Sequence, residues 1–169
     1  MAGKTSKKSA KVVRRGDKRD VARRLDPPAV RMGKAPLISL MLAVPDAQAA
    51  ASWYQRALGA KVLWSLGSVI GLEIEGAPFF VGQPENNGWA TPRTLGMPSC
   101  RIEVFCDDPD GLVARALKED ALLRHGRKVQ DPMRVHRMPW GPHRQGGFVD
   151  PFGHIWLGGD RSPLKPYPR

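Results

Sequence analysis

The sequence predicts an α+β fold built from two β-α-β-β-β modules. The body of the chain runs twice through the same order of apolar strand, aspartate-capped helix and short strands. A stretch rich in Pro, Asn and Gly separates the two runs, as a linker would. We therefore expect one domain over 36–160, with module one at 36–84, a linker at 85–98 and module two at 99–160.

Module one begins with the apolar run 37–44, which is typical of a strand. Asp46 follows the run and can cap a helix. The buried face of that helix is indicated by apolar residues at helical spacing, namely Ala50, Trp53, Tyr54, Ala57 and Leu58. Gly59 ends the helix, because glycine readily adopts the positive φ of a C-cap. Short strands are then expected at 61–66, 69–74 and 78–83.

Module two repeats this order. The acidic segment 107–110 is expected to cap a helix that runs to about Leu123, with Gly126 ending it. The segment Asp-Pro-Phe-Gly at 150–153 predicts a turn. The strands expected in this module are 100–106, 127–129, 135–140, 147–149 and 154–157.

Most of the net charge of +11 belongs to the first 35 residues. They hold 12 Lys or Arg and 3 Asp, a charge of +9, so +11 − 9 leaves +2 for 36–169. Residues 1–35 lack apolar periodicity, which predicts a disordered or weakly helical arm. The arm is either a solvated tail or a weak, nonspecific contact for polyanions; its three aspartates count against a third reading, an organellar transit peptide. Residues 161–169 are expected to form a C-terminal tail.

Cys100 and Cys106 are predicted to be free thiols. They are six residues apart on one expected strand, which separates them by roughly 20 Å and excludes a disulfide between them. Free thiols are typical of the reducing cytoplasm, where we expect the protein to reside. No apolar stretch approaches the roughly 20 residues of a membrane-spanning helix, so no membrane partner is expected.

Three segments resemble the vicinal oxygen chelate superfamily of glyoxalases, bleomycin resistance proteins and dioxygenases. The segment SWYQRALGAKV at 52–62, after Asp46, resembles the first strand–helix junction of these proteins. The segment RIEVFCDDPDGLVARAL at 101–117 resembles the same junction in a second module. The segment MPWGPHRQGGFVDPFGHIW at 138–156 resembles the ending of the bacterial glyoxalase-like subgroup. The resemblance implies a curled mixed sheet around a cavity, and a homodimer that covers the open sheet edges.

The resemblance also implies a metal in the cavity, held by residues of the first and last strands of each module. Carried onto this chain, the first-strand positions fall on Ser39 and Arg101, and the last-strand positions fall on Val81 and Leu157. A catalytic metal needs about three protein donors. Serine is a poor ligand, valine and leucine are none, and an arginine cation has no lone pair to give. We therefore expect neither a metal nor a cofactor.

The remaining ionisable residues leave alternatives open. The histidines are His125, His136, His143 and His154. They show no spacing that favours a displaced metal site, and His154, after the Asp-Pro-Phe-Gly turn, is expected to be structural. The strand residues Glu73, Glu75 and Glu103 are candidate general bases, although alternation along a strand favours solvent-facing positions for them.

The tryptophans divide into two groups. Trp53 and Trp156 fit core positions, whereas Trp64, Trp89 and Trp140 are candidates for the wall of a binding cavity. The alternative is that each tryptophan fills the core or a dimer interface.

Arg101 with Trp140 is the preferred ligand-binding pair, because a guanidinium beside an aromatic face suits a planar anion. The other residues expected at this site are Trp64, Ser39, Met41 and Leu157. Until a ligand arrives, Arg101 is expected to pair with a nearby carboxylate, for which Glu73, Glu75 and Glu103 are the candidates, or to stay hydrated.

Two functions remain. One is a metal-free binding protein of the bleomycin-resistance type that sequesters a planar neutral or anionic small molecule. The other is a glyoxalase- or dioxygenase-like lyase or isomerase whose metal site is displaced or absent.

Overall fold

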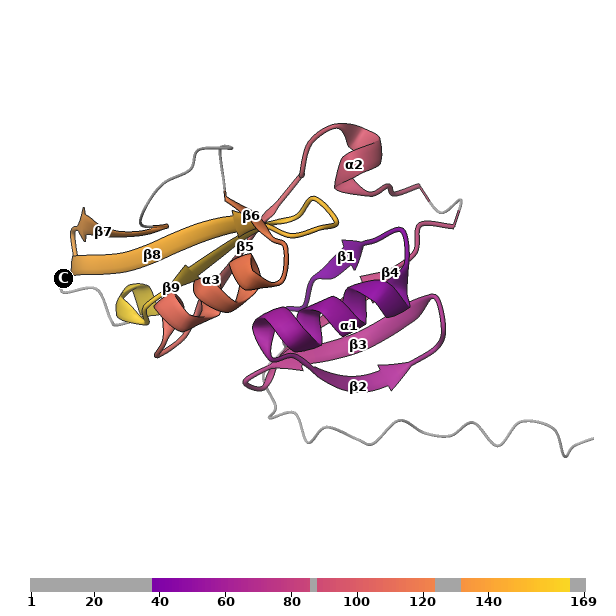
Figure 1. The fold of residues 1–169 in the computed structure, drawn as a ribbon, viewed down its shortest axis with the longest axis horizontal. Helices are drawn as coiled ribbons and strands as arrows, with labels where there is room; N and C mark the ends of the chain where they lie inside the picture. The colour runs from indigo at the N-terminus through magenta and orange to yellow at the C-terminus, as the bar shows by residue number, and fades with distance from the viewer. Residues whose placement is uncertain (1–37, 86–87, 124–131, 165–169) are drawn as a thin grey trace, which may run out of the picture. The chain divides into compact units, whose positions relative to one another are not determined.

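The computed structural model describes residues 38–85, 88–123 and 132–164 (Figure 1). The chain divides into two units, Met1–Lys34 and Ala35–Arg169, and every described residue belongs to the second. The arm expected at 1–35 therefore lies outside the described residues. Within them, no helix is long and apolar enough to cross a bilayer.

Module one has the predicted β-α-β-β-β order. Its elements are β1 (Met41–Ala43), α1 (Ala47–Leu58), β2 (Lys61–Ser65), β3 (Val69–Ile74) and β4 (Ala77–Gly82). The sheet runs in the order β1-β4-β3-β2, with β1 parallel to β4 and the other pairs antiparallel. The helix has the predicted ends: the Asp46 carboxylate accepts from the backbone N–H groups of Gln48 and Ala49, and Gly59 lies at φ 68°.

The linker contains a short helix that the sequence pattern did not predict, α2 (Pro92–Leu95). The Thr91 side chain caps it by accepting from the backbone N–H of Thr94, and proline occupies its first turn. These are recognisable start signals, but four residues are too few to show apolar periodicity.

Module two forms a second mixed sheet. Its elements are β5 (Arg101–Phe105), α3 (Pro109–Lys118), β6 (Leu122–Leu123), β7 (Met133–Met138), β8 (Gly141–Val149) and β9 (Ile155–Gly159), followed by the 3-10 turn η1 (Ser162–Leu164). The strand order is β5-β9-β8-β6, with β7 on β8. The two mixed sheets, neither closed into a barrel, give the α+β architecture of two modules that the sequence predicts.

The second helix is shorter than predicted. It ends at Lys118, Asp120 adopts a φ of 65°, and Leu122–Leu123 pair with β8 instead of extending the helix. Helical spacing alone could not show this, because the competing hydrogen bonds come from a strand more than twenty residues away. Gly126 and the strand expected at 127–129 lie outside the described residues.

One core joins the two modules. Trp53 and Trp156 are buried as predicted, and Tyr54 of α1 packs edge-on against Phe79 of β4 and at a tilt against Trp156 of β9. The core thus contains side chains from both modules of the unit, although their sheets share no hydrogen-bonded strand pair within the described residues.

Candidate functional site

Each sheet has one face against its own helix and one face away from it, which we call its open face. In module two, a Cβ at Gly158 would lie 2.9 Å from Leu112 and 3.1 Å from Val113 of α3, so this position faces the helix. Because side chains alternate along a strand, Leu157 and Gly159 lie on the open face. The register pairs Glu103 with Leu157 and Arg101 with Ile155, which places Arg101 and Glu103 on the open face as well.

Arg101 forms an ion pair on this face. Its Nη2 lies 2.5 Å from Oε1 of Glu103, and the side chains are 51% and 31% exposed. The expectation that Arg101 pairs with a glutamate is confirmed. The pair is hydrated rather than buried, so the guanidinium can meet an incoming anion at small desolvation cost.

Ser39 is the counterpart of Arg101 in module one. Asp46, which caps α1, lies seven residues after Ser39. Asp108, which caps α3, lies seven residues after Arg101. The Ser39 hydroxyl, however, donates to the carbonyl of Pro78 at 2.8 Å, so it is already engaged with its own sheet.

The last-strand position of module one is Phe80, and the expectation of Val81 is wrong. Ser39 lies beside Pro78 in module one, and Arg101 lies beside Ile155 in module two. Phe80 and Leu157 each lie two residues further along the last strand, so Phe80 is the counterpart of Leu157. Val81 is fully buried on the helix-facing side, because a register shift of one residue exchanges the two faces.

The four positions that hold the metal in the resembling proteins are therefore occupied by Ser39, Phe80, Arg101 and Leu157. Their side chains end in a hydroxyl, a phenyl ring, a guanidinium and an isobutyl group. This donor set does not fit a divalent cation. Elsewhere in the described part of the chain, no three His, Cys, Asp or Glu side chains gather as a metal would require.

The open face of module one is aromatic. Trp64 packs over Gly71, where a Cβ would be 2.6 Å from its ring, and Trp64 and Phe80 have ring centroids 5.4 Å apart. The linker's Trp89 covers Gly82 in the same way and meets the Met41 sulfur there. The sequence reasoning identified Trp64, Trp89 and Met41 but missed Phe80; the alternation along β4 would have shown it if the register had been fixed.

Trp140 is remote from Arg101. It precedes β8, whereas Arg101 lies beside Ile155, which pairs with Val149 at the other end of that strand. Eight residue steps separate the two ends by roughly 25 Å. The register contradicts the expected pairing of Arg101 with Trp140 around one small ligand.

A cavity of about 390 Å³ is lined by both modules, by the residues before β1 in module one and by β5 from Ile102 to Phe105 in module two. Ser39 of module one and Glu103 and Phe105 of β5 line it, and Arg161 lies at its wall. The ion pair of Arg101 thus adjoins a cavity that Ser39 also reaches. Glu75, another lining residue, is held by Arg161 at 3.2 Å, so Glu75 and Glu103 are ion-pair partners and not free bases.

His143 lies on the open face of module two and was missed as a functional residue. Its ring lies over Gly159, 6.1 Å from the ring of Phe105, and its Nδ1 is 3.0 Å from the Asp160 carboxylate. Burial opposes the ionisation of Asp160, but hydrogen bonds from Ser162, the Arg144 backbone and His143 outweigh it and hold the pKa of this carboxyl well below its usual range. An ionised Asp160 only accepts, so Nδ1 donates to it, and Nε2 carries the free lone pair of a neutral ring.

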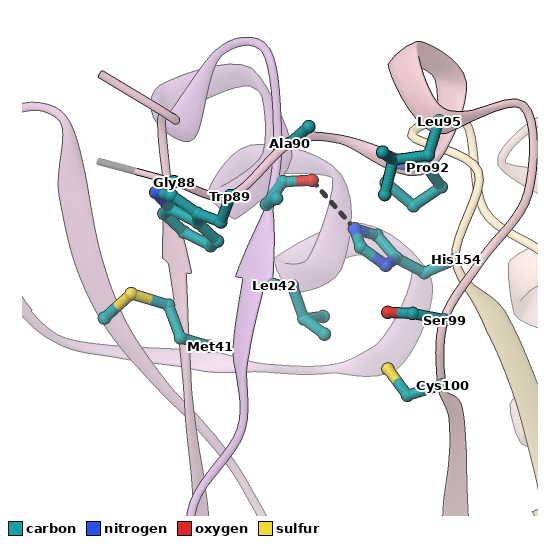
Figure 2. Close-up of a pocket in the computed structure, with 11 residues that line it drawn as sticks. Met41, Leu42, Gly88, Trp89, Ala90, Pro92, Leu95, Ser99, Cys100 and His154 are labelled. Atoms are coloured by element: carbon teal, nitrogen blue, oxygen red, sulfur yellow. Dashed lines mark hydrogen bonds between the residues drawn. The ribbon is translucent and has the colours of Figure 1, made fainter. Parts of the chain in front are cut away.

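A second cavity, which we call the linker pocket, has a volume of about 380 Å³ and lies between β1 and the linker. Its lining includes Met41, Trp89, Leu95, Ser99, Cys100 and His154 (Figure 2). His154 is structural as expected, since its backbone N–H donates to Asp150. Its ring, however, does not bond a turn carbonyl: Nε2 lies 2.9 Å from the carbonyl oxygen of Ala43 on β1. Cys100 is exposed and Cys106 is buried, and both are free thiols, as predicted.

Known proteins resemble this chain in family and fold. A model of the Glyoxalase/Bleomycin resistance protein/Dioxygenase superfamily matches residues 37–157. No curated protein matches the chain. Among solved structures, TioX from Micromonospora sp. ML1 is 22% identical with a TM-score of 0.55, covering 75% of this chain and 98% of that one.

Two further structures agree. A glyoxalase/bleomycin resistance protein from Albidiferax ferrireducens T118 is 16% identical with a TM-score of 0.57, covering 74% of this chain and 98% of its own. A lactoylglutathione lyase from Agrobacterium tumefaciens is 17% identical with a TM-score of 0.55, covering 76% and 96%. At such identities these likenesses establish the fold alone.

Proposed function

Because the chain belongs to the Glyoxalase/Bleomycin resistance protein/Dioxygenase superfamily, we propose that it is a metal-free member that binds and sequesters a planar, neutral or anionic small molecule. The observation that carries the proposal is the aromatic open face of module one, where Trp64 covers Gly71 and the ring centroids of Trp64 and Phe80 lie 5.4 Å apart. In a member without metal donors, such a surface supplies binding energy through stacking and apolar burial.

The charge on module two supports an anionic or neutral ligand over a cationic one. Arg101 is half exposed beside the cavity that Ser39 lines, and a ligand carboxylate could replace Glu103 or water as its partner. Leu157 lies beside Glu103 on the same face. We expect the planar part of the ligand on Trp64 and Phe80, with Met41 at its edge, and the anionic group directed toward Arg101.

Matched probes test this proposal. Naphthalene-2-carboxylate, naphthalene-2-carboxamide and naphthalene-2-methylammonium share one ring system and differ in charge. Calorimetry should show the carboxylate and the amide binding more tightly than the cation. Trp64→Ala should weaken the carboxylate and the amide together, and Arg101→Ala should weaken the carboxylate alone by about 1.5–3 kcal/mol. The matched control is Trp140→Phe, at the far end of β8, which should change neither.

The proposal fails if Trp64→Ala leaves the binding of all three probes unchanged. If Arg101→Ala binds the carboxylate as tightly as wild type but melts far lower, Arg101 is a structural partner of Glu103 and the anion site lies elsewhere.

A homodimer is part of this proposal. Among the described strands, β1 and β5 each have a partner on one side only, and open edges of this kind are commonly covered by a second chain. Light scattering on the purified protein should give twice the chain mass of 18.6 kDa; a monomer at micromolar concentration would remove the dimer from the proposal.

A second candidate function rests on His143. A histidine whose Nδ1–H is held by an ionised aspartate has the arrangement of a general base, and its Nε2 lies on the same face as Arg101. This observation favours a metal-free isomerase or lyase that removes a proton next to a carbonyl. NMR in D2O would detect such chemistry as exchange of the α-protons of aromatic α-hydroxyketones. His143→Gln should abolish the exchange, whereas His136→Gln on β7 should leave it unchanged.

A further inference from the structure

The linker pocket presents two side-chain nitrogens for which the described residues provide no hydrogen-bond partner, the indole Nε1–H of Trp89 and Nδ1 of His154. The His154 ring is 4% exposed, and its Nε2 faces the carbonyl oxygen of Ala43. A carbonyl oxygen only accepts, so Nε2 carries the proton, and Nδ1 of the neutral ring keeps its lone pair. No described residue donates to Nδ1. Figure 2 shows this nitrogen turned toward the side of the pocket where Ser99 and Cys100 lie.

The surroundings of His154 restrict the ligand chemistry. No Asp, Glu, Lys or Arg is among the described residues that line the pocket, and its walls are formed mainly by apolar side chains, with Met41, Trp89 and Leu95 among them. The volume of about 380 Å³ lies within the range of small-molecule sites, about 300–1,000 Å³. Apolar walls with one acceptor, Nδ1 of His154, and one donor, the indole N–H of Trp89, favour a neutral, mostly apolar molecule whose polar group both donates and accepts, as a hydroxyl does.

We infer that the linker pocket is a second binding site, which takes a neutral phenol-type molecule whose hydroxyl donates to Nδ1 of His154. The ring of the ligand packs against Trp89 and Leu95, and the thiol of Cys100 lies at the wall of the same cavity. This inference goes beyond the proposed function, since the phenol needs neither Arg101 nor the Trp64 surface.

Cys100 reports occupancy in the unmodified protein, because it is exposed whereas Cys106 is buried. One thiol should therefore react quickly with a disulfide reagent such as DTNB and the other slowly. We expect 4-methylphenol to slow the fast reaction in a saturable manner. Its methyl ether, 4-methylanisole, has the same ring but no donor, and should need roughly threefold to tenfold higher concentration for equal protection, the worth of one hydrogen bond.

Two variants locate the binding. Leu95→Trp fills the pocket from an exposed position, so it should abolish protection without unfolding the protein. Trp64→Ala, on the open face of module one, should leave protection unchanged. Protection that is absent in wild type, that is equal for phenol and ether, or that survives Leu95→Trp would overturn the inference. Loss of protection in Trp64→Ala would place the phenol on the open face, which overturns the second site and leaves the proposed function standing.

Discussion

The hydroxyl of Tyr54 on α1 donates to the buried carboxylate of Asp150, 96 residues away in the turn before β9, at 2.6 Å. The same carboxylate accepts from the indole N–H of Trp156 and from the backbone N–H groups of Phe152 and His154. Asp150 is 2% exposed and has four donors around it. Through these hydrogen bonds, Asp150 connects α1 of module one to the turn before β9 in module two.

Tyr54→Phe should destabilise the protein by about 1.5–3 kcal/mol, because it removes a buried hydrogen bond to a charged group. Urea unfolding followed by circular dichroism measures the loss. Asp150→Ala should cost more than Tyr54→Phe, since it leaves four buried donors without an acceptor. The control is Tyr167→Phe, at the only other tyrosine, for which no loss is expected. Equal stability of Tyr54→Phe and wild type would show that the hydroxyl is not engaged in solution.

The same contact predicts an alkaline limit to stability. Burial raises the pKa of Tyr54 well above 10.0, and the neighbouring Asp150 raises it further. A raised folded-state pKa means that this stabilisation is complete below about pH 10 and is lost as pH rises toward the folded pKa. The free energy of unfolding should therefore fall above pH 10. In Tyr54→Phe this part of the decline, measured by urea unfolding at a series of pH values, should disappear.

Gly158→Ala should destabilise the contact between β9 and α3 by about 1–3 kcal/mol, the usual cost of overpacking a core. A Cβ there would lie 2.9 Å from Leu112 and 3.1 Å from Val113. In a double-mutant cycle with Leu112→Ala, the combined loss should be smaller than the sum of the two single losses, because the second change removes part of the clash. Strict additivity would mean that the strand and helix do not touch at this point.

Metal content should be low. Protein purified without chelators should contain well under one equivalent of zinc, nickel, iron or manganese, since Ser39, Phe80, Arg101 and Leu157 supply no suitable donor set. Plasma mass spectrometry measures this directly. A stoichiometric metal that is lost in His143→Ala would favour the enzyme over the binding protein.

Deleting residues 1–34 should leave the melting temperature nearly unchanged and remove most binding to heparin or DNA. The segment carries most of the net charge and has no apolar periodicity with which to build a core. Binding by the full chain should fall steeply with salt. A large drop in melting temperature on deletion would mean that the arm packs on the domain.

Local signals determined much of the fold. The Asp46 cap, the Gly59 C-cap and the spacing of Trp53 and Tyr54 define α1 within the chain itself, and the structure confirms each of them. These features depend on contacts a few residues apart, which short-range periodicity and capping chemistry report directly.

Tertiary structure decided what depends on register and on distant partners. The expected register of β4 was wrong by one residue, so Val81 was predicted on the open face where the structure has Phe80. The length of β8 separates Trp140 from Arg101, which the sequence had paired. The orientation of the His154 ring likewise depends on Ala43, 111 residues earlier in the chain. Strand pairing fixes all three positions through hydrogen bonds between segments remote in sequence, and no local pattern carries that information.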